Sequence, residues 1–94
     1  MTKYFLFTNT EGDMKLVNVD DIISITLDFT PYKQLFEIHV KGEAPCYFSI
    51  PGGKQIDTDK AVELVKSMMY NLMTQKHPVF DWEHFCKNRS KMGG

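Results

Sequence analysis

Two histidines and two cysteines are the residues of this chain whose chemistry best suits a metal ion: His39, Cys46, His84 and Cys86. Structural zinc needs four such ligands, commonly in cysteine pairs about two to four residues apart and histidine pairs about three to five apart. No pair here has that spacing, and His84 and Cys86 diverge by about 200° on a helix. We therefore expect buried thiols and surface imidazoles, with no bound metal.

Two pairs of polar residues could support acid–base or cation chemistry. Glu37 and His39 lie two residues apart, so they share one face of a strand and could form an acid–base pair. Asp20 and Asp21 could contact a cation, but adjacent side chains diverge on a strand, whereas hard cations need several oxygens around one point. A solvated face and a turn are the simpler interpretations. Since no serine or cysteine has a nucleophile context, we expect that the protein is not an enzyme.

A glycine pair invites comparison with phosphate-binding loops. Residues 51–54 read Pro-Gly-Gly-Lys and lie between a predicted strand and a predicted helix. A Walker loop needs an earlier glycine and a hydroxyl after the lysine, because backbone amides hold the phosphate and the hydroxyl holds magnesium. The first glycine is missing here and Gln55 replaces the hydroxyl. The segment is therefore interpreted as a connection, and no cofactor is expected.

The end of the chain is basic, although the formal net charge of the whole chain is −1. Lys87, Arg89 and Lys91 follow closely on Trp82 and Phe85. Basic and aromatic side chains together can contact nucleic-acid phosphates and bases. Three charges are few, so nucleic-acid binding through these basic residues is the alternative hypothesis. The simpler interpretation is that the aromatic residues pack on the body of the protein while the lysines keep the end soluble.

The elements that must position these residues begin with strands in the first half of the chain. Apolar and polar residues alternate there, and segments rich in glycine, proline and aspartate separate the alternating runs. The predicted strands are residues 3–8, 14–19, 22–29, 35–41 and 46–50. We expect them to form a mainly antiparallel meander over residues 1–50.

The third of these strands has the clearest pattern. Its alternation predicts one buried face, which comprises Ile23, Ile25, Leu27 and Phe29. Residues 3–8 differ, because they are apolar on both faces, which is typical of a strand covered on both sides.

The pattern changes to helical spacing after residue 53. Asp57 and its neighbours are N-cap candidates for a helix from about Thr58 to Gln75. Apolar residues cover about half the circumference of this helix, which is more than packing on one sheet requires. The surplus includes Met69 and Met73, and methionine adapts well to binding surfaces. We expect this surplus to face the C-terminal segment or a partner.

A second, short helix is predicted from Trp82 to about Lys87. Asp81 is its N-cap candidate, and Phe80 and Phe85 have the spacing of a hydrophobic staple. Residues 88–94 are expected to fray. The sequence thus predicts an α+β domain in which one long C-terminal helix packs on a five-stranded, mainly antiparallel sheet, followed by a short helical aromatic tail. In this scheme residues 1–94 form a single domain: a meander (1–50), a helix (57–76) and a C-terminal extension (78–94).

Between residues 11 and 65 a series of positions forms a recognisable pattern: Gly12, 16–19, Ile22, Ile25, 38–42 and 47–50, followed by a helix that starts near Thr58 and carries Val62 and Val65. In this pattern the segment, somewhat over half of the chain, resembles the small FlbD-type proteins known from flagellar operons. The chain departs from that pattern in its longer helix and its aromatic, basic end. The resemblance implies a similar small α+β fold and carries no catalytic or binding residues.

Composition and charge narrow the function further. The chain is 43% hydrophobic and 24% charged, with a pI of about 6.3, which indicates a folded domain that is not a general nucleic-acid binder. It has neither a secretory leader nor a membrane span by pattern, and its two cysteines are too few for a disulfide framework, so we expect a cytoplasmic protein.

Together these features predict a non-enzymatic protein-interaction or regulatory module that self-associates, as a homodimer, or binds another protein. Its partner surface is expected to comprise Met69, Met73, Phe80, Trp82 and Phe85.

Overall fold

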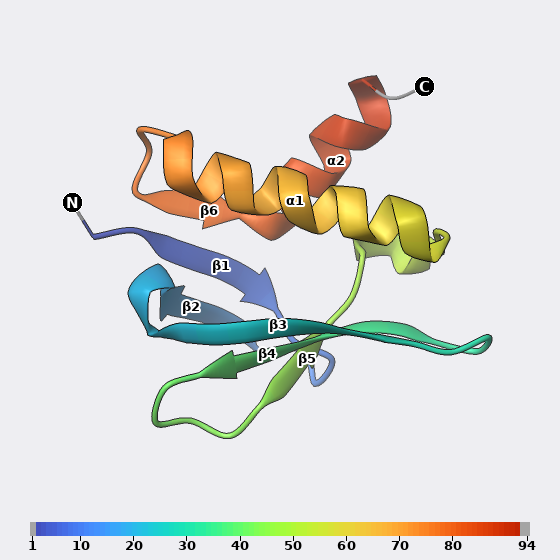
Figure 1. The fold of residues 1–94 in the computed structure, drawn as a ribbon, viewed down its shortest axis with the longest axis horizontal. Helices are drawn as coiled ribbons and strands as arrows, with labels where there is room; N and C mark the ends of the chain where they lie inside the picture. Colours follow the sequence, from blue (N-terminus) through green and yellow to red (C-terminus); the bar gives the residue numbers. More distant parts are fainter. Residues whose placement is uncertain (1, 93–94) are drawn as a thin grey trace.

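Residues 2–92 of the chain form two three-stranded sheets and two α-helices (Figure 1). The computed structural model describes residues 2–92, and their side chains as far as residue 88. The elements in chain order are β1 (Tyr4–Thr8), β2 (Met14–Asn18), η1 (Val19–Asp21), β3 (Ile22–Phe29), β4 (Gln34–Val40), β5 (Cys46–Phe48), η2 (Pro51–Gly53), α1 (Thr58–Thr74), β6 (Val79–Asp81) and α2 (Trp82–Met92).

The first sheet, called sheet A here, has the strand order β2-β1-β6. β1 and β2 are antiparallel, with Leu6 opposite Leu16, whereas β1 and β6 are parallel, with Phe5 opposite Phe80. A parallel pair requires a long crossover connection, because the chain must return to the same end of the sheet. Here the segment that carries β3, β4, β5 and α1 supplies that connection.

The predicted single five-stranded sheet is wrong, because the chain turns away from sheet A after β2. Asn18 Oδ1 accepts a hydrogen bond from the backbone N–H of Asp20 at 2.9 Å, at the start of the 3-10 turn η1. β3 therefore begins a second sheet, and β6, which lies in the segment predicted as the C-terminal extension, completes the first. The prediction missed β6 because three residues are too few to show an alternating pattern.

The second sheet, sheet B, is an antiparallel meander in the order β3-β4-β5. Its pairing is regular from Ser24 to Phe29, but the register shifts between Ile22 and Ser24. Because of this β-bulge the side chain of Ile23 is 70% exposed, and Ile22 packs against the core instead. The predicted burial of Ile23 is therefore wrong.

The predicted long helix is confirmed as α1, with an end one residue earlier. Asp57 is its N-cap, and the Asp57 side chain accepts a hydrogen bond from the backbone N–H of Lys60 at 2.8 Å. At the other end, Lys3 Nζ donates hydrogen bonds to the carbonyl oxygens of Leu72 and Met73, at 2.8 and 3.0 Å. A cation there balances the partial negative charge of the helix C-terminus and ties β1 to α1.

α2 begins at Trp82 as predicted but continues to Met92, so the expected fraying from residue 88 is wrong for the backbone of residues 88–92. Asp81 Oδ1 accepts hydrogen bonds from the backbone N–H groups of Glu83 and His84 at 3.1 and 3.4 Å. The rings of Phe80 and Phe85 lie 5.0 Å apart, which confirms the predicted staple across the start of the helix.

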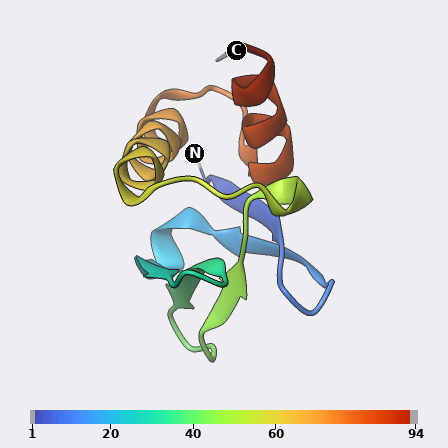
Figure 2. The same cartoon turned by 90° about the vertical axis from the view of Figure 1, so that its right-hand side faces the viewer.

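The core lies between the two sheets and under both helices. Figures 1 and 2 place α1 and α2 on one side of the molecule and sheet B on the other, with β1 between them. Trp82 occupies the centre, where its ring contacts those of Phe5, Phe36 and Phe48 at centroid distances of 5.2 to 6.3 Å. Its Nε1–H donates a hydrogen bond to the carbonyl oxygen of Ser49 at 2.9 Å, so this buried polar group is satisfied.

Candidate functional site

The residues predicted to form a partner surface divide into two groups. Phe80 and Trp82 are 3% and 1% exposed and belong to the core, and Phe85 is half-buried against it. Met69 and Met73 are 54% and 77% exposed. The structure therefore leaves the methionines on the surface and removes Phe80 and Trp82 from it.

The aromatic residues are buried because of β6. Its pairing with β1 places the ring of Phe80 5.9 Å from that of Phe5, and α2 then starts with Trp82 directed between the sheets. Phe80 and Trp82 of the predicted tail surface are thus an integral part of the core, and the exposed apolar side chains lie elsewhere.

One side of α1 carries exposed apolar side chains, which we call the apolar flank of α1: Val62, Val65, Met69 and Met73. At about 100° per residue these four follow one another around the helix at intervals of about 20–40°. Val65 is half-buried against the core, and the other three are exposed. Beyond Leu64, on the opposite flank, lie the polar residues Lys60, Ser67 and Asn71. The surplus apolar surface predicted for the helix is therefore confined to one flank.

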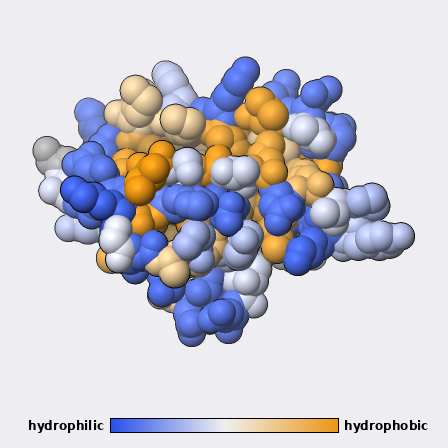
Figure 3. All heavy atoms as spheres, turned by 60° about the horizontal axis from the view of Figure 1, so that its bottom comes forward, coloured by the Kyte–Doolittle hydropathy of each residue, from blue (hydrophilic) through white to orange (hydrophobic). Residues whose placement is uncertain are grey.

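The direction of this flank follows from the handedness of the helix. Figure 2 looks along α1 from its first turn, and a right-handed helix turns clockwise as it recedes. In this clockwise direction the apolar flank comes directly after the buried face of α1, which comprises Ala61, Leu64, Met68 and Leu72. The apolar flank therefore lies on the side of α1 that is toward β3 and away from α2. In Figure 3 hydrophobic side chains gather in the upper part of the face that includes α1 and β3, with hydrophilic side chains below them.

Beneath this flank, β3 is an edge strand of sheet B. Its neighbour on one side is β4, and among residues 2–92 no strand pairs with its other side. The backbone N–H of Thr30 donates to the carbonyl oxygen of Lys33 at 2.8 Å, so Thr30 and Lys33 form a hydrogen-bonded pair. Hydrogen-bonded and non-hydrogen-bonded pairs alternate along an antiparallel ladder, so every second residue of β3 before Thr30 turns its backbone groups toward β4 and the residues between them do not. It follows that Ile25, Leu27 and Phe29 direct their backbone N–H and C=O groups outward, and we call these groups the free edge of β3. The sequence could not reveal this edge, because strand order is not encoded in alternation.

Exposed apolar side chains also occur outside the apolar flank of α1, among them those of β2 and of the β3–β4 hairpin. Met14 and Leu16 project from the outer face of β2, and Leu16 is opposite the half-buried Leu6. Tyr32, 92% exposed, stands at the tip of the β3–β4 hairpin, which projects from the body of the molecule in Figure 1.

Glu37 and His39, which were considered as an acid–base pair, are part of a small polar cluster on the outer face of sheet B. His39 Nε2 lies 3.2 Å from Glu37 Oε1, and the Tyr47 hydroxyl donates a hydrogen bond to Glu37 Oε2 at 2.9 Å. Hydrogen bonds from His39 and then from Tyr47 lower the pKa of Glu37, while the carboxylate raises the pKa of Tyr47. Glu37 is thereby held as a carboxylate, which is the form of an acceptor rather than of a general acid near neutral pH.

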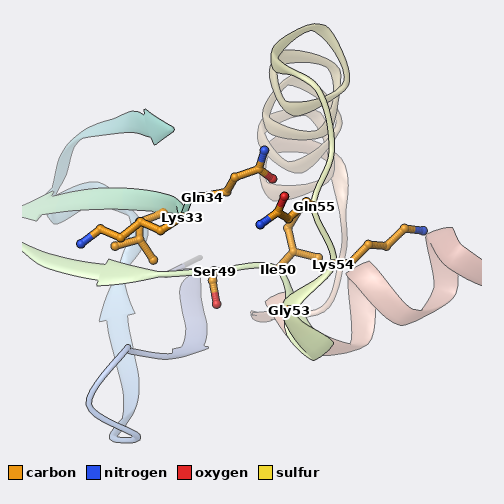
Figure 4. Close-up of a pocket in the computed structure, with 8 residues that line it drawn as sticks. Lys33, Gln34, Ser49, Ile50, Gly53, Lys54 and Gln55 are labelled. Carbon is orange, nitrogen blue, oxygen red and sulfur yellow. The ribbon is translucent and has the colours of Figure 1, made fainter. Parts of the chain in front are cut away.

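Gly53 of the glycine pair borders a shallow depression of about 200 Å³ between the β3–β4 hairpin and residues 49–55 (Figure 4). Gln34 anchors the connection there, because its side chain exchanges hydrogen bonds of 2.6 and 2.8 Å with the backbone of Ile56. Gly52 and Gly53 both have positive φ, which lets the chain turn from β5 toward α1. In Figure 4 the ammonium groups of Lys33 and Lys54 point in opposite directions, so they do not converge on one anion.

The remaining candidates are dispersed. Within the described residues no three His, Cys, Asp or Glu side chains gather as metal ligands. Cys46 is half-buried, and burial raises the pKa of its thiol. Lys87 is exposed on α2, whereas the side chains of Arg89 and Lys91 lie outside the described part of the chain. Of the three basic residues in the nucleic-acid hypothesis, the structure therefore describes the side chain of Lys87 alone.

In the part of the chain that the structure describes, no helix is both long and apolar enough to cross a membrane.

Comparisons with known proteins give no further information about the site. No protein-family model, curated protein or solved structure matches the chain, so the resemblance to FlbD-type proteins stays a prediction.

Proposed function

We propose that this protein is a non-enzymatic interaction module that self-associates through the apolar flank of α1. The observation that carries the proposal is the exposure of Val62, Met69 and Met73 along one side of a helix whose opposite flank is polar. Exposed apolar surface of this kind costs free energy in water and is typical of interaction sites when it is contiguous.

The chemistry of the other features supports a binding role rather than catalysis. The carboxylate, imidazole and phenol of Glu37, His39 and Tyr47 lie on the outer face of sheet B, where their side chains are partly exposed to water. Catalytic groups depend on a site that excludes water and concentrates the electrostatic field. Methionine, by contrast, suits a surface that must adapt to a partner.

Sedimentation analysis at tens of micromolar tests the proposal. We expect a particle larger than one 10.9 kDa chain, and we expect Met69→Ser with Met73→Ser to shift it toward the monomer. Met14→Ser with Leu16→Ser is the matched control, because it removes equally exposed apolar side chains from the outer face of β2. A monomeric wild-type protein would contradict self-association, and dissociation by the control pair alone would place the interface on β2.

A further inference from the structure

We propose that two copies of this chain pair antiparallel through the free edge of β3, so that the two B sheets join into one six-stranded sheet. The proposal rests on the self-association proposed above and names its partner and geometry. It requires that the edge be available, that it lack features that prevent pairing, and that it be complementary to itself.

The edge is available because its backbone groups have no partner in the described chain. No backbone hydrogen bond among residues 2–92 reaches the outward N–H and C=O groups of Ile25, Leu27 and Phe29. Unpaired groups of this kind form a template for another strand, since each residue can exchange two hydrogen bonds with a partner opposite it.

Few features of β3 prevent such pairing. Natural edge strands are commonly short, or carry lysine or proline, which disfavour the addition of another strand. At eight residues β3 is the longest strand in the described part of the chain. It contains neither lysine nor proline, and its one charged side chain is that of Asp28. The edge strand β2 contains Lys15 within only five residues. The bulge at Ile23 protects only the beginning of β3, so the regular segment starts at Ser24.

Charge and register select one arrangement of two such edges. With Leu27 on the twofold axis, Ile25 lies opposite Phe29 of the second copy, and all outward backbone groups find partners. Asp28 then lies opposite Thr26, so no two carboxylates face each other. A twofold axis at Asp28 would oppose identical charges, which is destabilising, and an axis at Thr26 would bring Phe29 against the bulge.

The same arrangement accounts for exposed apolar side chains that would otherwise remain in water. Each α1 lies over its own β3 (Figures 1 and 2), so pairing of the strands brings the two apolar flanks toward each other. It also brings the exposed Ile23 of one copy near Tyr32 of the other. Ile23 lies near the beginning of β3 and Tyr32 lies in the turn after its end, and antiparallel pairing sets the beginning of one β3 beside the end of the other. One symmetric contact therefore covers three separate apolar features.

A charge cycle at two exposed positions tests the pairing. Thr26→Asp places a carboxylate opposite Asp28 of the second copy, twice in each dimer. We expect the dissociation constant, measured by sedimentation equilibrium, to rise by between about twofold and thirtyfold. Adding Asp28→Lys to Thr26→Asp converts both pairs to opposite charges and should restore association to the wild-type level or tighter. Thr10→Asp, the same change on an exposed turn, is the control and should leave the dissociation constant unchanged.

The outcomes separate this inference from the function on which it rests. Rescue of Thr26→Asp by Asp28→Lys supports the β3 pairing and its register. If the double variant associates as weakly as Thr26→Asp alone, or if Thr26→Asp has no effect, the strand pairing is overturned. Self-association through α1 would then still stand, provided that the variant of Met69 and Met73 dissociates. A wild-type protein that stays monomeric overturns both proposals.

Discussion

The aromatic residues of the C-terminal segment and the methionines of α1 look alike in the sequence, as apolar surplus beyond the needs of one sheet. In the structure Trp82 is enclosed by rings from β1, β4 and β5, whereas Met69 and Met73 face solvent. The difference arises because β6 extends sheet A beside β1 and brings the aromatic residues under cover. On the β3 side of the molecule no described element follows to cover α1. Apolar surplus that the chain's own topology does not cover is therefore where a partner should be sought.

The largest effect that would test this contrast is expected from Trp82→Ala. The substitution removes the central ring of the core and leaves a cavity, so we expect the free energy of unfolding to fall by about 3–5 kcal/mol in urea titrations. Tyr32→Ala is the control, because its ring is exposed in the single chain and its loss should change stability by less than about 0.5 kcal/mol at concentrations where the protein is monomeric. Similar losses for the two variants would contradict the sealed core described for the C-terminal segment.

Two adjacent methionines of α1, Met68 and Met69, allow the buried face of the helix to be compared with its exposed apolar flank. Met68 is fully buried and Met69 is exposed. Met68→Ala should lower the free energy of unfolding by about 2–5 kcal/mol, whereas Met69→Ala should change it by less than about 0.5 kcal/mol at concentrations where the protein is monomeric. A large loss for Met69→Ala in the monomer would mean that the flank is packed within the chain.

The N-caps of α1 and α2 should have equal, moderate effects on the free energy of unfolding. Asp57→Ala and Asp81→Ala each remove a side-chain oxygen that accepts from a helix N–H, so each should cost about 1 kcal/mol in urea unfolding. Substitution by Asn keeps an acceptor oxygen and should retain most of that stability. If Asn were as destabilising as Ala, the carboxylate charge rather than the cap hydrogen bond would be responsible.

The smallest effect concerns the polar cluster on sheet B. The pKa of Glu37 is lowered from 4.5 in the folded protein, so its contribution to stability is present above that value and disappears as the pH falls through the lowered pKa. Tyr47→Phe removes one of the two hydrogen bonds and should move the pKa of Glu37 back up, as measured by NMR titration of its carboxyl carbon. An unchanged pKa in Tyr47→Phe would show that Tyr47 does not hold the carboxylate.

The parts of the structure that depend on local sequence could be predicted. Asp57 and Asp81 mark helix starts because a cap needs only a side-chain oxygen two or three residues before the N–H that it accepts from. The exposure of Ile23 could not be predicted, because a bulge changes the register without changing the residue types. The same holds for β6 and for the burial of Phe80, which depend on a parallel pairing between residues far apart in the chain. The candidate site was predicted in part: Met69 and Met73 came from helical spacing, whereas the free edge of β3 depends on strand order.

Amide hydrogen exchange at β3 tests the central claim most directly. In the paired dimer, the outward amides of Ile25, Leu27 and Phe29 should exchange slowly, and they should lose this protection on dilution to the monomer. The amides of Ser24, Thr26 and Asp28, which face β4, provide the internal reference and should stay protected at both concentrations. If the outward amides exchange rapidly at every concentration while the reference amides are protected, the free edge of β3 is not an interface.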